Sequence, residues 1–234
     1  MAQTTIKWLS HACFSITTPK DKVILIDPWI SDNPLCPVKM DDLNRVDIIL
    51  VTHDHFDHCA NAADISKKTG ALVIGQPETV GRLKTGLSLP EGNVVFGGIG
   101  MNTGGSTSVE GITITMTQAF HSSETGSPCG YIINLKDGPT IYHAGDTGIF
   151  GSMKTLAELY PIDIALLPIG GCFTMDPAQA VAAVKLLNPK QVIPMHYKTF
   201  PILEQNANGF VELAKKEVPK TKVTVLEPGG YCSV

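Results

Sequence analysis

Short apolar runs follow one another along most of this chain, and nearly all of them end at a glycine, a proline or a polar residue. Such runs, rich in β-branched side chains, are typical of strands. The segments with this pattern are residues 6–9, 13–17, 23–26, 48–52, 71–74, 111–117, 131–135, 140–142, 164–167, 191–194 and 222–226. The run at 48–52 is unbroken, which predicts a strand buried on both faces.

Few segments have helical signals. The predicted helices are residues 61–68, 76–83, 178–187 and 209–216. The best marked is 178–187, because Asp176 can cap its start, Pro177 suits its first position and Asn188 precedes a proline at its end. The glycine-rich stretch 94–108 lacks the strand-then-helix setting of a phosphate-binding loop, so hairpin turns are predicted there.

Many strands separated by a few helices predict an α/β sandwich. No linker rich in proline, serine or charge interrupts the chain, so we expect one domain over residues 1–234. Residues 47–51 and 163–167 share a pattern, an aspartate followed by four apolar residues. Two equivalent halves would explain this repeat, and a chance similarity between buried strands would explain it equally well.

Composition narrows the functional classes. Hydrophobic residues make up 43% of the 234 residues and the formal net charge is −4, so no overall basic field attracts nucleic acid, although a local basic patch stays open. The N-terminus has no signal-peptide pattern, and no apolar segment approaches the roughly 20 residues needed to span a bilayer. Six dispersed cysteines without a C-x-x-C pair indicate reduced thiols, as in a cytoplasmic protein.

The strongest chemical pattern follows the strand predicted at 48–52. His53, His55 and His58 fall within six positions, together with Asp57. Residues two apart in an extended loop can point the same way, so His53 and His55 can share one metal ion. Asp57 and His58 can turn toward a second ion where a helix begins.

Other candidate ligands also follow predicted strands. His121 comes after the strand at 111–117, Asp146 after 140–142, and His196 after 191–194. Binding sites in layered α/β proteins gather in the loops beyond one edge of the strands. Imidazole and carboxylate groups at four separate strand ends therefore predict a metal site rather than a histidine-rich polar loop.

This arrangement, H-x-H-x-D-H followed by a distant His, a Gly-Asp-Thr and a later His, resembles the metallo-β-lactamase superfamily over essentially the whole chain. The sequences around Asp27-Pro28, Asn33-Pro34, 142–147 and 194–197 resemble more narrowly the metal-dependent hydrolases related to ascorbate-6-phosphate lactonase. The resemblance implies a four-layer αββα sandwich. It also implies that His53, His55 and His121 hold a first metal, that Asp57, His58 and His196 hold a second, and that Asp146 bridges them.

Imidazole and carboxylate ligands without a thiolate favour zinc, and manganese and iron suit the same donors. Flavodiiron relatives have glutamate at the position of His55, so the histidine favours hydrolysis over oxygen chemistry. Two adjacent cations lower the pKa of a water between them toward neutrality, which supplies hydroxide without a serine or cysteine nucleophile. Asp57 and Asp146 are therefore the predicted catalytic carboxylates.

Several neighbours have two interpretations. His11 contacts either substrate or a metal ligand, or it is structural. His143 favours a hydrogen bond to substrate or to a ligand over a metal bond. Asp27 orients a ligand imidazole or forms a turn. Lys198 either meets an anionic substrate group or is solvated. Cys59 is expected to be a packed side chain, and Cys172 to lie on a loop facing the site.

We therefore expect a cytoplasmic hydrolase that uses a metal-activated water on a lactone, ester or phosphoester of a small anionic metabolite. The alternatives are a phosphodiesterase or nuclease, and a metal-dependent binding protein without turnover. Partners are expected to be a small molecule and neither membrane nor nucleic acid, with a homo-oligomer left open. The loops 31–41 and 122–128 are the predicted pocket walls.

Overall fold

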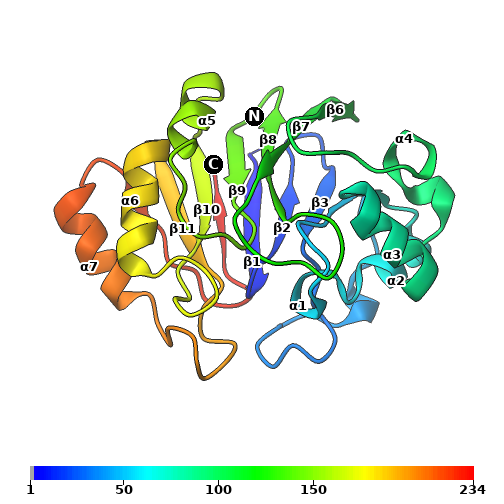
Figure 1. Cartoon of the computed structure of the whole chain (residues 1–234), viewed down its shortest axis with the longest axis horizontal. Helices are drawn as coiled ribbons and strands as arrows, with labels where there is room; N and C mark the ends of the chain where they lie inside the picture. Colours follow the sequence, from blue (N-terminus) through cyan, green and yellow to red (C-terminus); the bar gives the residue numbers. More distant parts are fainter. Residues whose placement is uncertain (1–2) are drawn as a thin grey trace.

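The computed structural model describes residues 3–234, and its strands form two mixed sheets packed face to face (Figure 1). One sheet has the order β13-β1-β2-β3-β4-β5: Tyr231–Ser233, Thr5–Ser10, Cys13–Thr17, Val23–Ile26, Ile48–Leu50 and Leu72–Ile74. The other has the order β12-β11-β10-β9-β8-β7-β6: Lys222–Val223, Gln191–Met195, Ile164–Pro168, Thr140–His143, Cys129–Leu135, Ile112–Gln118 and Ser106–Val109.

Side chains along the first sheet point alternately to its two faces. Ile48 and Leu50 of β4 join the hydrophobic cluster between the sheets. Ile49 and Val51 belong to a second cluster on the outer face, together with Ile65 of a covering helix. Both faces of β4 are therefore buried, as the unbroken apolar run predicts.

Helices cover the outer face of each sheet. On one side lie α1 (Phe56–Cys59), α2 (Ala62–Thr69), α3 (Pro77–Leu87) and α4 (Val95–Gly98). On the other lie α5 (Met153–Leu159), α6 (Pro177–Leu187) and α7 (Asn208–Glu217), as Figure 1 shows. Two short 3₁₀ turns occupy Met40–Asp42 and Glu91–Asn93. The layers run helix, sheet, sheet, helix, which confirms the αββα sandwich.

Helix α6 forms as its sequence predicts. The Asp176 carboxylate accepts a hydrogen bond from the Gln179 amide at 2.8 Å, and Pro177 occupies the first turn. Asn188 ends the helix in the left-handed conformation, with φ of +46°. Its apolar residues, such as Val181 and Val184, are buried.

The two sheets share one strand plan. From β1 to β5, neighbouring strands pair antiparallel, antiparallel, parallel and parallel, and the pairs from β7 to β11 repeat that order. The repeated aspartates hold equivalent places, since Asp47 accepts a hydrogen bond from the Val23 amide at 2.9 Å and Asp163 from the Thr140 amide at 2.8 Å. The sequence repeat therefore reflects two equivalent halves rather than chance.

Some elements differ from the prediction. Helix α5 buries only Met153 completely, so it leaves little apolar pattern in the sequence. Strand β13 is a three-residue edge strand that pairs with β1. Strand β12 ends at Val223 instead of residue 226, because the chain there crosses from the second sheet to the first. The stretch 94–108 contains the single turn α4 and strand β6 besides its glycine turns.

Candidate metal centre

The predicted ligand segments meet at one edge of the sandwich. Strand β4 leads into the histidine-rich segment 53–58, β7 into His121, β9 into Asp146 and β11 into His196. Binding sites of α/β sheets lie beyond the carboxyl ends of their parallel strands, and β4, β9 and β11 all end here. Strand order thus gathers residues that lie far apart in the sequence.

One carboxylate lies at the centre. Asp146 Oδ2 is 2.8 Å from His196 Nε2, 3.2 Å from His58 Nε2 and 3.6 Å from His121 Nε2. Asp146 is only 2% exposed. Three imidazoles from three segments therefore converge on a single buried carboxylate oxygen.

The donor atoms fall into three overlapping sets, and within each set they lie within 4.8 Å of one another. The sets are His53, His55 and His121; His11, Asp57, His58 and His196; and His53, His58 and Asp146. The third set shares one residue with each of the others and so links them. All seven predicted ligands are brought together, with His11 beside them.

Hydrogen bonds fix the tautomers of two imidazoles. Asp27 Oδ2 accepts from the Thr52 hydroxyl at 2.6 Å and from His58 Nδ1 at 2.8 Å. Because the Thr52 proton goes to Asp27, the same hydroxyl oxygen must accept from His53 Nδ1, 3.0 Å away. In the neutral rings, the lone pairs of His53 and His58 are then on Nε2, the nitrogens that face the centre. Asp27 therefore orients an imidazole, and with φ of +47° it also forms the turn.

The centre suits a cation. Buried polar atoms normally have hydrogen-bond partners, yet several here have none in hydrogen-bond geometry within residues 3–234, although two of them lie close to Asp146 Oδ2. They are His58 Nε2, Asp146 Oδ1, and Nδ1 and Nε2 of His196. These orphaned atoms, with the donor sets, fit imidazole and carboxylate coordination of divalent metal ions.

Burial and nearby charges shift the pKa values of the histidines in different directions. Burial lowers the pKa of His53 well below its usual 6.5 and lowers that of His121 as well. Burial would also lower the pKa of His58, but the carboxylates of Asp146 and Asp27 outweigh it and raise that pKa well above the usual value. His196 and His58 in turn keep the pKa of Asp146 well below its usual range despite burial. Without a cation, the proton on His58 offsets the Asp146 charge.

His11 lies behind the ligands and not in the pocket. It is fully buried, and burial and His196 lower its pKa to about 3, so it is neutral. Its Nε2 hydrogen-bonds Asp57 Oδ2 at 3.0 Å, and its Nδ1 contacts the Thr199 hydroxyl. The structure therefore favours contact with a candidate ligand over the expected contact with substrate.

The other two predicted substrate contacts are corrected. His143 is fully buried, its Nε2 donates to the Ala12 carbonyl at 2.9 Å, and its Nδ1 accepts from the Gly145 amide at 3.1 Å, so no ring nitrogen remains for substrate. Lys198 adopts φ of +72°, and its Nζ lies 3.3 Å from Glu227, outside the pocket wall. Both side chains already have protein partners.

Asp54, between the first two motif histidines, has a role that the sequence did not indicate. Its fully buried carboxylate accepts hydrogen bonds from the Ser123 hydroxyl at 2.6 Å, the Glu124 amide at 2.8 Å and the Thr125 amide at 3.1 Å. These bonds lower its pKa although burial alone would raise it. Asp54 thus ties the histidine motif to the loop that follows His121.

A cavity of about 650 Å³ opens over the centre. Its wall includes the candidate ligands His55, Asp57, His121, Asp146 and His196, and also Asp54, Phe56, Arg82, Ser122, Glu124, Phe173, Phe200 and Ile202. The loop after His121 contributes to this wall as predicted, but residues 31–41 do not. Their place is taken by Phe173, which follows β10, and by Phe200 and Ile202, which follow β11.

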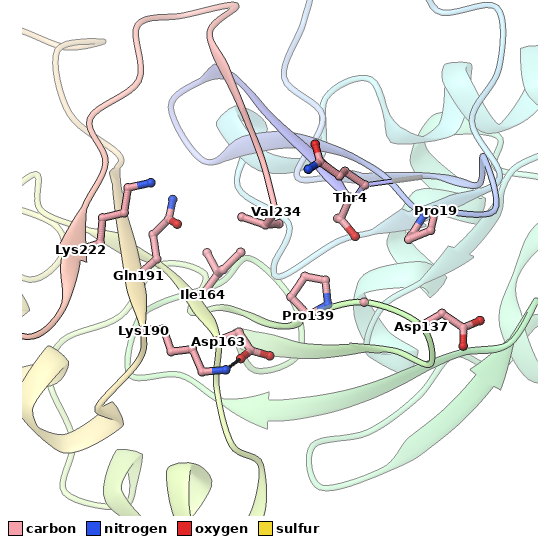
Figure 2. Close-up of a pocket in the computed structure, with 12 residues that line it drawn as sticks. Thr4, Pro19, Asp137, Pro139, Asp163, Ile164, Lys190, Gln191, Lys222 and Val234 are labelled. Carbon is pink, nitrogen blue, oxygen red and sulfur yellow. Dashed lines mark ion pairs between the residues drawn. The ribbon is translucent and has the colours of Figure 1, made fainter. Parts of the chain in front are cut away.

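A larger cavity, of about 870 Å³, lies at the other edge of the sheets (Figure 2). It is lined by the starts of β10, β11 and β12 at Ile164, Gln191 and Lys222. Lys190 pairs there with Asp163 at 2.7 Å, and the described lining residues include no histidine. The candidate metal ligands therefore lie at the smaller cavity.

The remaining predictions concern cysteines and membranes. Cys59 is buried in the outer cluster, and burial raises its pKa to about 12, so it is a packed side chain. Cys172 is exposed beside Phe173 of the pocket wall. Within residues 3–234, the helices are too short or too polar to cross a bilayer.

The chain is similar to known proteins over nearly its full length. Residues 22–197 match the family described as beta-lactamase superfamily domain. A UPF0173 metal-dependent hydrolase of Nitratidesulfovibrio vulgaris is 48% identical over 227 residues, which cover 97% of this chain and 94% of that protein. One from Pyrobaculum islandicum is 47% identical over 228 residues, covering 96% of this chain and 97% of that protein.

Among solved structures, Igni18, a metallo hydrolase of the archaeon Ignicoccus hospitalis, superposes with a TM-score of 0.86 at 37% identity, covering 99% of this chain and 98% of that one. The relatives and the His/Asp cluster agree on a metal-dependent hydrolase. The chain therefore belongs to the UPF0173 metal-dependent hydrolases of the metallo-β-lactamase superfamily.

Proposed function

We propose that the site holds two divalent metal ions, with zinc favoured by its imidazole and carboxylate donors. His53, His55 and His121 would hold the first ion, and Asp57, His58 and His196 the second. Asp146 would bridge the two. Manganese and iron suit the same donors, so metal identity needs its own measurement.

The observation that carries this proposal is the position of Asp146. Its Oδ2 lies within 3.6 Å of His121, from the first set, and within 3.2 Å of both His58 and His196, from the second. Its Oδ1 is buried without a partner. A carboxylate shared between two groups of imidazoles is what a bridging ligand requires.

When bound, two such ions supply a water whose pKa falls toward neutrality and a Lewis acid for the substrate oxygen. The chain's own residues prepare the site. Thr52 and Asp27 hold Nδ1 of His53 and Nδ1 of His58, so that Nε2 of each ring is the nitrogen that would face the metal ions. His11 holds Asp57 through a 3.0 Å hydrogen bond, which restrains that carboxylate against rotation.

For the reaction, we propose hydrolysis of a lactone, ester or phosphoester of a small anionic metabolite in the cytoplasm. A cavity of about 650 Å³ accommodates a small molecule. The net charge of −4 argues against a nucleic-acid polymer as substrate.

Elemental analysis of protein purified without chelator tests the metal assignment, and about two ions per chain are expected. A screen of lactones, carboxyl esters and phosphoesters should give turnover that is lost on chelation and restored by zinc or manganese. The Asp146→Ala variant is the matched inactive control. A metal content near zero after metal-supplemented refolding would contradict the dinuclear site, and metal binding without turnover would contradict the hydrolytic reaction.

A further inference from the structure

The wall of the cavity over the metal centre contains one arginine, Arg82. The chain has two arginines, Arg45 and Arg82, and only Arg82, on α3, lines the cavity over the metal centre. Its side chain is 43% exposed. Its Nη1 donates to the Asp54 carbonyl and lies 3.3 Å from Asp54 Oδ2. Within residues 3–234, its Nε and Nη2 have no hydrogen-bond partner, so this part of the guanidinium can bind a ligand.

Asp54 engages only part of the Arg82 guanidinium. Its carboxylate already accepts five hydrogen bonds from Ser123, Glu124 and Thr125, with the Thr125 amide shared between its two oxygens. It therefore anchors Nη1 of Arg82 and leaves the other guanidinium nitrogens available. A guanidinium held in this way is oriented in advance, which reduces the entropy lost when it pairs with a carboxylate.

The rest of the wall is largely apolar. Phe56 is 62% exposed, Phe173 is 53% exposed and Ile202 is 61% exposed, although all three line the same cavity. Trp29 stacks on Phe200 with ring centroids 5.6 Å apart, which supports the wall from behind. Apolar side chains gathered around a cavity and left in water mark a surface that binds apolar groups.

We propose that Arg82 is a specificity-determining residue that binds a carboxylate of the substrate, while the apolar wall receives an aromatic or alkyl body. This inference rests on the proposed hydrolytic function and narrows its substrates to esters or lactones that carry one carboxylate and an apolar body. Arg82 is the one Lys or Arg side chain among the described residues of this wall and lies beside the buried Asp54 and the exposed Glu124. Away from the metal ions, the wall therefore favours a monoanion over a phosphate dianion.

Matched esters test the assignment. The acetate esters of 4-hydroxybenzoate and of 4-hydroxybenzamide have the same ring and reacting bond, and differ in one charge. In wild-type zinc-loaded protein, kcat/KM should be higher for the carboxylate ester. Arg82→Gln should reduce the ratio of the two values about 10- to 100-fold, the range expected for a charge-assisted hydrogen bond. Arg82→Lys should lie between, since it keeps the charge and loses the fork.

Two further variants serve as controls. Arg45 is similarly exposed, at 48%, and pairs with Asp47 away from the cavity, so Arg45→Gln should leave the ratio unchanged. Glu124→Gln should raise the ratio, because it removes a carboxylate from the pocket mouth. Equal loss of both activities in Arg82→Gln, with the ratio unchanged, would overturn the proposal and leave Arg82 as structural support for Asp54.

Binding separates this inference from the proposed reaction. Calorimetry with 4-hydroxybenzoate and 4-hydroxybenzamide on the zinc-loaded protein requires no turnover. Preferential binding of the benzoate that disappears in Arg82→Gln would sustain the role of Arg82 even if neither ester were hydrolysed. Equal binding of the two probes by the wild-type protein would overturn it.

Discussion

Replacing Asp27 by asparagine tests how the protein sets the tautomers of its imidazoles. The asparagine keeps an oxygen for the Thr52 amide, which lies 2.8 Å from Asp27 Oδ1. In place of Oδ2 it offers an NH₂ group that faces two donors, the Thr52 hydroxyl and His58 Nδ1. A neutral His58 ring must then carry its proton on Nε2, the nitrogen 3.2 Å from Asp146. That nitrogen can no longer bind a cation.

The expected cost follows from this exchange. Loss of a group that orients a metal ligand weakens metal binding about 10- to 100-fold. At about 1.4 kcal/mol for each factor of ten, this corresponds to about 1.4–2.8 kcal/mol. The larger value is expected, because the Thr52 hydroxyl also contacts His53 Nδ1, so the disturbance reaches an imidazole of each metal set.

Competition with a fluorescent zinc chelator measures the affinity. Asp163→Asn is the matched control, since Asp163 also accepts a backbone amide hydrogen bond, from Thr140, at the opposite edge of the sheets. Zinc affinity should fall in Asp27→Asn and remain unchanged in Asp163→Asn. An unchanged affinity in Asp27→Asn, with folding intact by circular dichroism, would refute the tautomer argument.

Three other predictions concern the same centre. Asp146→Ala should abolish turnover and reduce the metal content below two ions per chain. His143→Ala should retain both ions and lose stability, because the His143 hydrogen bonds go to the backbone. Elemental analysis and thermal melts of the two variants test this, and the reverse pattern would contradict the assignment. The raised pKa of His58 means that this imidazole is protonated in the metal-free protein at and above pH 6.5. Zinc affinity should therefore weaken as pH falls, and zinc binding near pH 7 should release about one proton from His58. Calorimetry in buffers of different ionisation enthalpy measures the number of protons released, and no release would contradict the raised pKa. Gly170→Ala should lower zinc affinity or stability markedly, because the added Cβ would overlap the His196 carbonyl and lie 3.0 Å from its Nδ1. If both the zinc affinity and the melting temperature stayed at their wild-type values, the loop would have moved to make room for the Cβ and the prediction would be wrong.

The histidine motif was predictable because its spacing is local. In residues 53–58 the ligand positions follow from a strand that ends and a helix that begins, and both are visible in the sequence. His121, Asp146 and His196 could be added because each follows an apolar run. The pattern of strands and helices predicted an α/β sandwich, and the family resemblance added its four-layer αββα arrangement.

The surroundings of the site were harder to predict, because they depend on contacts between distant segments. Arg82 lies 28 residues from its partner Asp54, on a helix with no marked chemistry. His143 was predicted to hydrogen-bond substrate or a metal ligand, whereas the structure buries it with both ring nitrogens bonded to backbone groups. Lys198 pairs with Glu227, 29 residues further along the chain, and does not line the cavity.

The equivalent halves of the sandwich have a consequence for how the protein holds together. His53, His55, Asp57 and His58 come from the first half, whereas His121, Asp146 and His196 come from the second. Each proposed ion is thus shared across a seam, much as an ion at a subunit interface is shared between two protomers. An ion that binds only when the two halves are packed together stabilises their association. Each proposed ion would therefore hold the two halves together.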